Sequence, residues 1–167
     1  MIASIISLIH KMKRITALVV STLMVACNQT SIVDELQSKG KVATNLAKEK
    51  WHWNDSAKQS LSAGYAQTVK VGNTLYLSGI PAIDLTEEGV SNLYQSLEKA
   101  LQSFGASFEN VVKENLYTTD IEAMKSLNDV RKRFYKNDFP AATWVQISRL
   151  YEPQAKLEVD LVAVLPE

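Results

Sequence analysis

The sequence predicts an α+β domain in which two helices pack on one face of a mixed β-sheet. Two patterns carry this prediction. Several segments rich in β-branched and aromatic residues alternate polar and apolar positions, as strands do. Two other segments repeat apolar residues at spacings of three and four, as amphipathic helices do. Taken in chain order, these segments predict the arrangement β-β-α-β-α-β-β.

The first two predicted strands form a hairpin. Residues Tyr65–Val71 alternate polar and apolar side chains, and Gly72 and Asn73 provide a turn signal. The following residues, Thr74–Gly79, are rich in strand formers. Pro81 is expected to end the second strand.

The first predicted helix follows the hairpin. Its apolar stripe is formed by Val90, Leu93, Leu97, Leu101 and Phe104. Gly105 is expected to end this helix, because glycine readily adopts the left-handed conformation found just beyond a helix C-terminus.

The second half of the domain is predicted as strand, helix and two strands. Val111–Thr119 has the composition of a strand, and Asp120 is a plausible N-cap for a helix that runs to about Lys136. The inward positions of this helix are Met124, Leu127, Val130 and Phe134. Thr143–Leu150 and Lys156–Leu165 are the last two predicted strands.

Composition excludes several functional classes. The chain has 167 residues, which suits one domain, with 18 basic and 18 acidic side chains and a formal net charge of zero. Without a basic excess, we expect no nucleic-acid partner. One cysteine cannot form an internal disulfide, and two histidines do not favour a zinc site. We therefore expect neither a metal nor another cofactor.

The N-terminal segment has the pattern of a secretory signal. Residues 1–26 contain three basic residues and no acid, and Ile15–Ala26 is an uncharged apolar stretch too short to span a bilayer comfortably. Cys27 follows directly, as in a bacterial lipobox, so the sequence predicts lipidation of its thiol. The alternative interpretation is a buried or fortuitous cysteine. Translation from Met12 would give a more typical signal.

The predicted organisation is therefore a signal peptide at 1–26, a lipid-anchored tether at 27–50 and a folded domain at 51–167. Cleavage would leave 15 basic and 18 acidic side chains, a net charge of −3. The expected location is the bacterial cell envelope. Because Asn28 rather than aspartate follows the cysteine, a Gram-negative host would place the anchor in the outer membrane, on its periplasmic side.

Spacing alone identifies no catalytic constellation. The chain has no nucleophile-elbow, zinc-helix, phosphate-loop or CxxC motif. His52 is interpreted as a packing residue at a strand edge. The basic run Arg131–Arg133 is interpreted as a solvated helix surface.

Several separated stretches resemble the RidA/YjgF family of reactive-intermediate deaminases. They are GYAQTVKVGNTLYLSGIPA (Gly64–Ala82), LYQSLEKALQSFGASFENVVKENLYTTDIEAM (Leu93–Met124), NDFPAATWVQISRL (Asn137–Leu150) and KLEVDLVAV (Lys156–Val164). The resemblance implies a chorismate-mutase-like fold and a homotrimer with a small-molecule ligand in each inter-subunit cleft. It also implies cofactor-free hydrolysis of 2-imino or enamine acids.

The resemblance also implies a set of site residues. Tyr65 matches a cleft tyrosine, and Ser78 and Gly79 match the strand end beside it. Glu158 matches the acid thought to position water, although an exposed strand acid is the alternative interpretation. Tyr65 and Glu158 are thus the candidate catalytic residues.

The main departure from the family is at the strand that follows Phe-Pro-Ala. Ala142 stands where active deaminases have the arginine that binds the substrate carboxylate, and Trp144 replaces a cleft cysteine. Ala142, Thr143 and Trp144 are candidate substrate-binding residues. Trp144 shares a strand face with Ala142 and is expected to narrow the pocket. Arg149, seven positions beyond Ala142, is expected on the opposite face.

These features support two expectations about function. The first is a deaminase-like hydrolase of a C=N bond, with weak or absent activity on the usual 2-iminoacids. The second is a trimeric lipoprotein that binds a small ligand without catalysis or acts as a chaperone. Loss of the arginine is expected to cost a carboxylate ligand about 2–3 kcal/mol of binding free energy.

Overall fold

The structure is a computed structural model that describes residues 47–55 and 57–167. The predicted signal peptide, the alternative start at Met12, the lipidation site Cys27 and tether residues 27–46 lie outside the described residues. Among the residues that are described, no helix combines the length and apolar character needed to cross a membrane.

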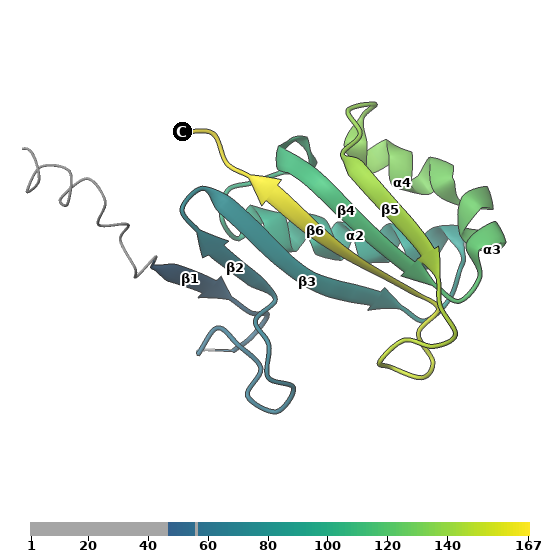
Figure 1. Ribbon diagram of the computed structural model, residues 1–167, viewed down its shortest axis with the longest axis horizontal. Helices are drawn as coiled ribbons and strands as arrows, with labels where there is room; N and C mark the ends of the chain where they lie inside the picture. The colour runs from purple at the N-terminus through teal and green to yellow at the C-terminus, as the bar shows by residue number, and fades with distance from the viewer. Residues whose placement is uncertain (1–46, 56) are drawn as a thin grey trace, which may run out of the picture. The chain divides into compact units, whose positions relative to one another are not determined.

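A six-stranded mixed sheet organises the domain (Figure 1). Its strand order is β1-β2-β3-β6-β4-β5, and all neighbours are antiparallel except β4 and β5, which are parallel. The strands are β1 (Lys48–Trp51), β2 (Thr68–Val71), β3 (Thr74–Ala82), β4 (Val111–Thr118), β5 (Ala141–Gln146) and β6 (Leu157–Val164).

Helices cover one face of this sheet (Figure 1). They are α2 (Glu87–Gln102), α3 (Ile121–Ser126) and α4 (Asn128–Tyr135), with a short 3₁₀ turn, η1 (Phe108–Asn110), before β4. The α+β fold and the placement of the helices on one face are as the sequence predicts. Gly105 has a φ of +74°, which fits the helix-ending position predicted for it.

The core fills the space between the helices and the facing side of the sheet. The fully buried leucines of this layer include Leu75 on β3, Leu97 and Leu101 on α2, Leu116 on β4 and Leu157 on β6. Each contributes about 1.5–3 kcal/mol by leaving water. Because side chains alternate along a strand, Glu158, Asp160 and Val162 of β6 lie on the opposite, open face of the sheet.

The predicted second helix is two helices. Asp120 caps α3 as expected, its Oδ1 accepting a hydrogen bond from the Ala123 backbone N–H at 3.0 Å. The helix then breaks at Leu127, whose φ and ψ are −94° and 5°. At the break, the Ser126 hydroxyl donates to the Ala123 carbonyl, a local bond that bends helices.

Four strands differ from the prediction by more than one residue. Strand β2 covers Thr68–Val71 rather than Tyr65–Val71. Strand β1 was not predicted; it lies at the end of the predicted tether, so the sheet begins at Lys48 rather than at Tyr65. Strand β3 continues through Pro81, which pairs with Glu158 of β6. The pairing with β2 ends at Leu77, so the β2 side of Pro81 has no strand partner. Strand β5 covers Ala141–Gln146 rather than 143–150.

Candidate functional site

The open face of the sheet carries a pocket of about 430 Å³ where β3 and β6 meet. Its lining residues are Ala63, Tyr65, Ser78, Gly79, Pro81, Tyr151, Glu152 and Glu158. This volume is within the range for small-molecule sites. The pocket therefore unites four of the site residues inferred from the sequence, which are Tyr65, Ser78, Gly79 and Glu158.

A β-bulge in β3 shapes the floor of this pocket. The register between β3 and β6 shifts between Leu77 and Ile80, so Ser78 and Gly79 lie at the irregularity. The Ser78 hydroxyl donates to the Ala66 carbonyl at 2.8 Å, and its backbone N–H donates to the Gln67 carbonyl at 2.9 Å. Ser78 thus fastens the bulge to the segment that precedes β2.

Gly79 allows Glu158 to lie close to the backbone of β3. A Cβ atom added at residue 79 would come within 2.7 Å of both Cγ and Cδ of Glu158, which is too close for any side chain. Residue 79 must therefore be glycine for the Glu158 carboxyl group to occupy its observed position.

Glu158 has the electrostatics of a group that can exchange protons. Partial burial raises the pKa of its carboxyl, and the charge of Asp160 raises it further. Asp160 is fixed by Asn115, whose Nδ2 donates to Asp160 Oδ1 at 2.9 Å. Tyr117 on β4 pairs in register with Glu158, and its own pKa is raised by burial and by the charges of Asp160 and Glu158.

Tyr65 is held in place by His52. Their rings meet edge to face at 5.0 Å between centroids. His52 Nδ1 also accepts a hydrogen bond from the Gln67 backbone N–H at 3.1 Å. These contacts give His52 a packing role. The sequence did not indicate that His52 would pack against Tyr65, the candidate catalytic tyrosine.

The other three candidate residues do not line this pocket within one subunit. Ala142 and Trp144 pair in register with Glu114 and Leu116, whose buried side chains lie beneath the helices. The two residues share a face, as strand alternation predicts, but it is the helix-facing side. Thr143 lies on the open face, where its Oγ1 accepts a hydrogen bond from Lys113 Nζ at 2.6 Å.

Trp144 instead belongs to a buried polar cluster centred on Glu114. Trp144 Nε1 donates to Glu114 Oε1 at 3.3 Å, and Arg131 Nε donates to the same oxygen at 2.7 Å. Glu114 Oε2 accepts from the hydroxyls of Tyr94 and Tyr135. Four side chains, from α2, α4 and β5, therefore donate hydrogen bonds to one carboxylate on β4.

The position of Arg131 corrects the interpretation of the basic run. Arg131 is only 6% exposed, whereas its neighbours Lys132 and Arg133 are on the surface and pair with Asp129 and Glu87. Burial disfavours the charged guanidinium, but the charge of Glu114, its hydrogen bond to Arg131 and the charges of the two tyrosines together outweigh burial and raise the pKa of Arg131. Burial and the charge of Glu114 likewise raise the pKa of the Tyr135 hydroxyl. Three consecutive basic residues in the sequence give no sign that the first is buried and the other two are exposed to solvent.

Arg149 also differs from the expectation based on strand alternation. Strand β5 ends at Gln146, so alternation does not apply at residue 149. Arg149 Nη2 donates to the Tyr151 carbonyl at 3.4 Å, close to the pocket but outside its lining.

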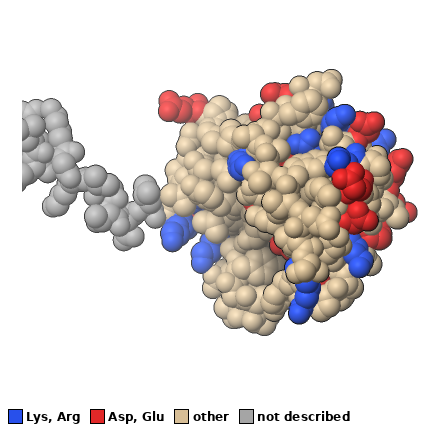
Figure 2. Space-filling view, turned by 45° about the vertical axis from the view of Figure 1, so that its right-hand side comes forward, with Lys and Arg blue, Asp and Glu red and all other residues tan. Residues whose placement is uncertain are grey.

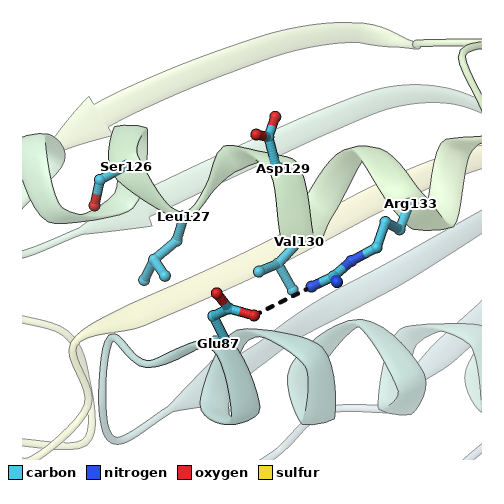
Figure 3. Close-up of a pocket in the computed structure, with 6 residues that line it drawn as sticks. All are labelled: Glu87, Ser126, Leu127, Asp129, Val130 and Arg133. Atoms are coloured by element: carbon cyan, nitrogen blue, oxygen red, sulfur yellow. Dashed lines mark ion pairs between the residues drawn. The ribbon is translucent and has the colours of Figure 1, made fainter.

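A second pocket, of about 270 Å³, lies between α2 and the break between α3 and α4 (Figure 3). Arg133 reaches across it to Glu87, with 3.6 Å between Nη2 and Oε2, and Asp129 points away from α2. None of the site residues inferred from the sequence lines this pocket.

Charge and metal-binding potential are limited in the described domain. Figure 2 shows one face, on which basic and acidic side chains are interspersed without a broad basic area. Within residues 47–55 and 57–167, no three His, Cys, Asp or Glu side chains are grouped so that they could hold a metal ion.

The fold is that of a YjgF-like α+β domain, and sequence comparison assigns the family of the chain. The model of the endoribonuclease L-PSP family matches residues 57–165. The chain therefore belongs to this family, which is the RidA/YjgF family.

Curated relatives agree with this assignment. The chain is 30% identical over 110 residues to a 2-iminobutanoate/2-iminopropanoate deaminase of Dermatophagoides farinae, covering 60% of this chain and 85% of that protein. It is 29% identical over 109 residues to the human protein of the same name, with 60% and 79% covered. A RutC family protein of Aquifex aeolicus is 32% identical over 110 residues, with 60% and 87% covered.

Solved structures support the same fold. A YjgF-family protein of Mycobacterium tuberculosis superposes with a TM-score of 0.63 at 19% identity, covering 71% of this chain and 100% of that one. RidA from an Antarctic Psychrobacter superposes with a TM-score of 0.57 at 26% identity, covering 66% and 97%. The first similarity is informative about fold alone.

Proposed function

We propose that the protein is a deaminase-like hydrolase that cleaves the C=N bond of a small imine or enamine. The observation that carries this proposal is the half-buried Glu158 carboxyl, which faces the same pocket as Tyr65 and lies directly over Gly79. A carboxyl group whose pKa is raised above its ordinary value by burial holds a proton more readily and can both accept and donate one. The names of the deaminase relatives support the same chemistry.

The proposed reaction uses Glu158 twice. Glu158 first takes a proton from water as the water oxygen adds to the carbon of the protonated C=N bond. The resulting carbinolamine receives that proton on nitrogen from Glu158, and the C–N bond breaks with its electron pair leaving on ammonia. The hydroxyl proton passes to the departing ammonia, so the products are a carbonyl compound and ammonium. Tyr65 lines the same pocket and positions water or substrate there.

Activity on ordinary 2-iminoacids is expected to be weak or absent. Ala142 offers no group that binds a carboxylate, whereas an arginine would bind one with two hydrogen bonds. A loss of about 2–3 kcal/mol of binding free energy corresponds to a decrease of roughly 30- to 150-fold in the binding constant.

We further propose that the complete site forms between subunits of a homotrimer. Strand β5, which carries Ala142, Thr143 and Trp144, is the edge strand of the sheet and is exposed over most of its length. A second copy could therefore bring its β5 to the pocket of the first. Tyr76 and Val145, both exposed and apolar on the open face, are consistent with burial in such an assembly.

The location proposed for the protein is the bacterial cell envelope, with a lipid on Cys27. The support is the sequence pattern alone, which combines a basic segment, a short apolar stretch and a cysteine. In a Gram-negative host, the anchor would be in the outer membrane on the periplasmic side. More than one acyl chain on the cysteine would hold the protein stably at the membrane.

The second candidate function is non-catalytic binding of a small ligand or a chaperone-like role in the same assembly. The observation that favours it is the replacement of the carboxylate-binding arginine by Ala142, which leaves the pocket but removes a substrate anchor.

Ammonia release from enzymatically generated 2-iminobutanoate tests the proposal. We expect a slow reaction that Glu158→Gln abolishes and Ala142→Arg accelerates, while Glu122→Gln, at an exposed salt bridge on α3, leaves the rate unchanged. Rates at the level of an arginine-containing relative would contradict the proposed effect of Ala142. If Glu158→Gln retains the full rate, or if no imine is hydrolysed by any variant, the binding function is favoured instead.

A further inference from the structure

We propose that the pocket beside Glu158 takes a positively charged small molecule without a carboxylate, of the class of amines and protonated imines. The proposal rests on the function proposed above and names the substrate class of the same pocket. Three observations support it, namely the negative charge of the lining, its aromatic rings and the position of the basic side chains outside the lining.

The charge of the lining is negative. Glu152 and Glu158 are its ionisable acids, and none of the eight lining residues is lysine, arginine or histidine. Asp160 adds a third carboxylate close enough to affect Glu158. A carboxylate ligand would therefore meet like charges, whereas an ammonium or iminium ion would meet opposite ones.

The aromatic content of the lining also favours a cation. Tyr65 and Tyr151 contribute rings, and they are 40% and 82% exposed, so their faces are accessible to a ligand. The face of an aromatic ring attracts ammonium groups, and cages of rings and carboxylates recognise such groups. His52 already packs against Tyr65 edge to face, which restricts the orientation of that ring.

Basic groups in the described domain lie outside the lining. The Arg149 guanidinium donates to the Tyr151 carbonyl, so it is adjacent to the pocket mouth but is directed to the backbone. Arg131 is buried against Glu114 on the other face of the sheet. Residue 142, the position of the arginine in deaminases, is alanine. A ligand with a carboxylate group would need a basic side chain in the pocket, but the pocket of one subunit has only acidic ones.

Three ligands of similar size and different charge test the proposal. They are benzylamine, which is a cation at pH 7, benzyl alcohol, which is neutral, and benzoate, which is an anion. We expect benzylamine to bind about tenfold more tightly than benzyl alcohol, and benzoate to bind more weakly than either. Binding is measured by isothermal titration calorimetry with the purified protein at low and at physiological ionic strength.

Variants then assign the effect to the pocket. Glu152→Gln is expected to weaken benzylamine binding about fivefold with no loss for benzyl alcohol. Tyr151→Leu keeps an apolar side chain but removes the ring, and we expect about a threefold loss for benzylamine. Glu122→Gln makes the same change in net charge on α3, away from the pocket, and is expected to leave all three affinities unchanged.

Two results would overturn the proposal. One is that benzoate binds as tightly as benzylamine. If Arg149→Met then weakens benzoate binding, Arg149 is the residue that binds the carboxylate. The other is benzylamine binding that neither Glu152→Gln nor Tyr151→Leu weakens. The order of the three affinities is independent of catalysis, so it distinguishes this proposal from the proposed hydrolysis, which the ammonia assay measures separately.

Discussion

Replacing Arg131 by methionine is expected to destabilise the protein far more than its place in a basic surface run suggests. The Glu114 side chain is 0% exposed, and Arg131 is the cation that neutralises it, with 2.7 Å between Nε and Oε1. Methionine would leave a buried carboxylate with only the hydrogen bonds from Tyr94, Tyr135 and Trp144.

The size of the effect follows from the cost of an unpaired buried charge. Removing one member of a buried ion pair costs about 3–5 kcal/mol of unfolding free energy. The three remaining hydrogen-bond donors offset part of this loss, so we expect about 3 kcal/mol for Arg131→Met. Because a domain of this size has a total stability of about 5–15 kcal/mol, the loss is a large fraction of it.

Urea unfolding followed by tryptophan fluorescence measures this loss, at one fixed protein concentration because assembly would add to stability. Arg133→Met is the matched control. Its salt bridge to Glu87 has side chains 65% and 76% exposed, and its loss should cost less than about 0.5 kcal/mol. The double variant Glu114→Gln/Arg131→Met removes both charges and should recover about 2 kcal/mol. Equal effects of Arg131→Met and Arg133→Met would refute the reasoning.

Three further predictions concern the pocket and the N-terminus. Gly79→Ala should displace the Glu158 carboxyl and lower any Glu158-dependent hydrolysis by about tenfold or more, measured as ammonia release; an unchanged rate would show that the close approach is unimportant. Because the pKa of Glu158 is raised in the folded protein, its ionisation destabilises the fold as pH rises through that pKa. Glu158→Gln should therefore raise the melting temperature relative to the unsubstituted protein at pH 8, and this difference should disappear toward pH 4. A difference that grows toward pH 4 would contradict the raised pKa of Glu158. Cys27→Ser should abolish incorporation of labelled palmitate and release the protein from membranes; retained labelling would exclude this attachment site.

Local patterns in the sequence were sufficient for most of the elements. The apolar stripe of α2 and the alternation in β6 correspond directly to their buried faces. The break at Leu127 was not predicted, because its apolar spacing continues across both helices. Strand β1 was missed because Lys48, Glu49 and Lys50 have no apolar alternation, and their pairing with β2 depends on backbone hydrogen bonds.

The sequence by itself determined the family, the order of the elements and the absence of arginine at residue 142, since these depend on residue types along the chain. Only the tertiary structure decided which side chains share a space. It joined Tyr65 and Glu158, which are far apart in the chain, in one pocket with Tyr151 and Glu152. It also placed Trp144 on the opposite face of the sheet, beside Glu114. Strand register and the β3 bulge are set by long-range pairing, which no local pattern specifies.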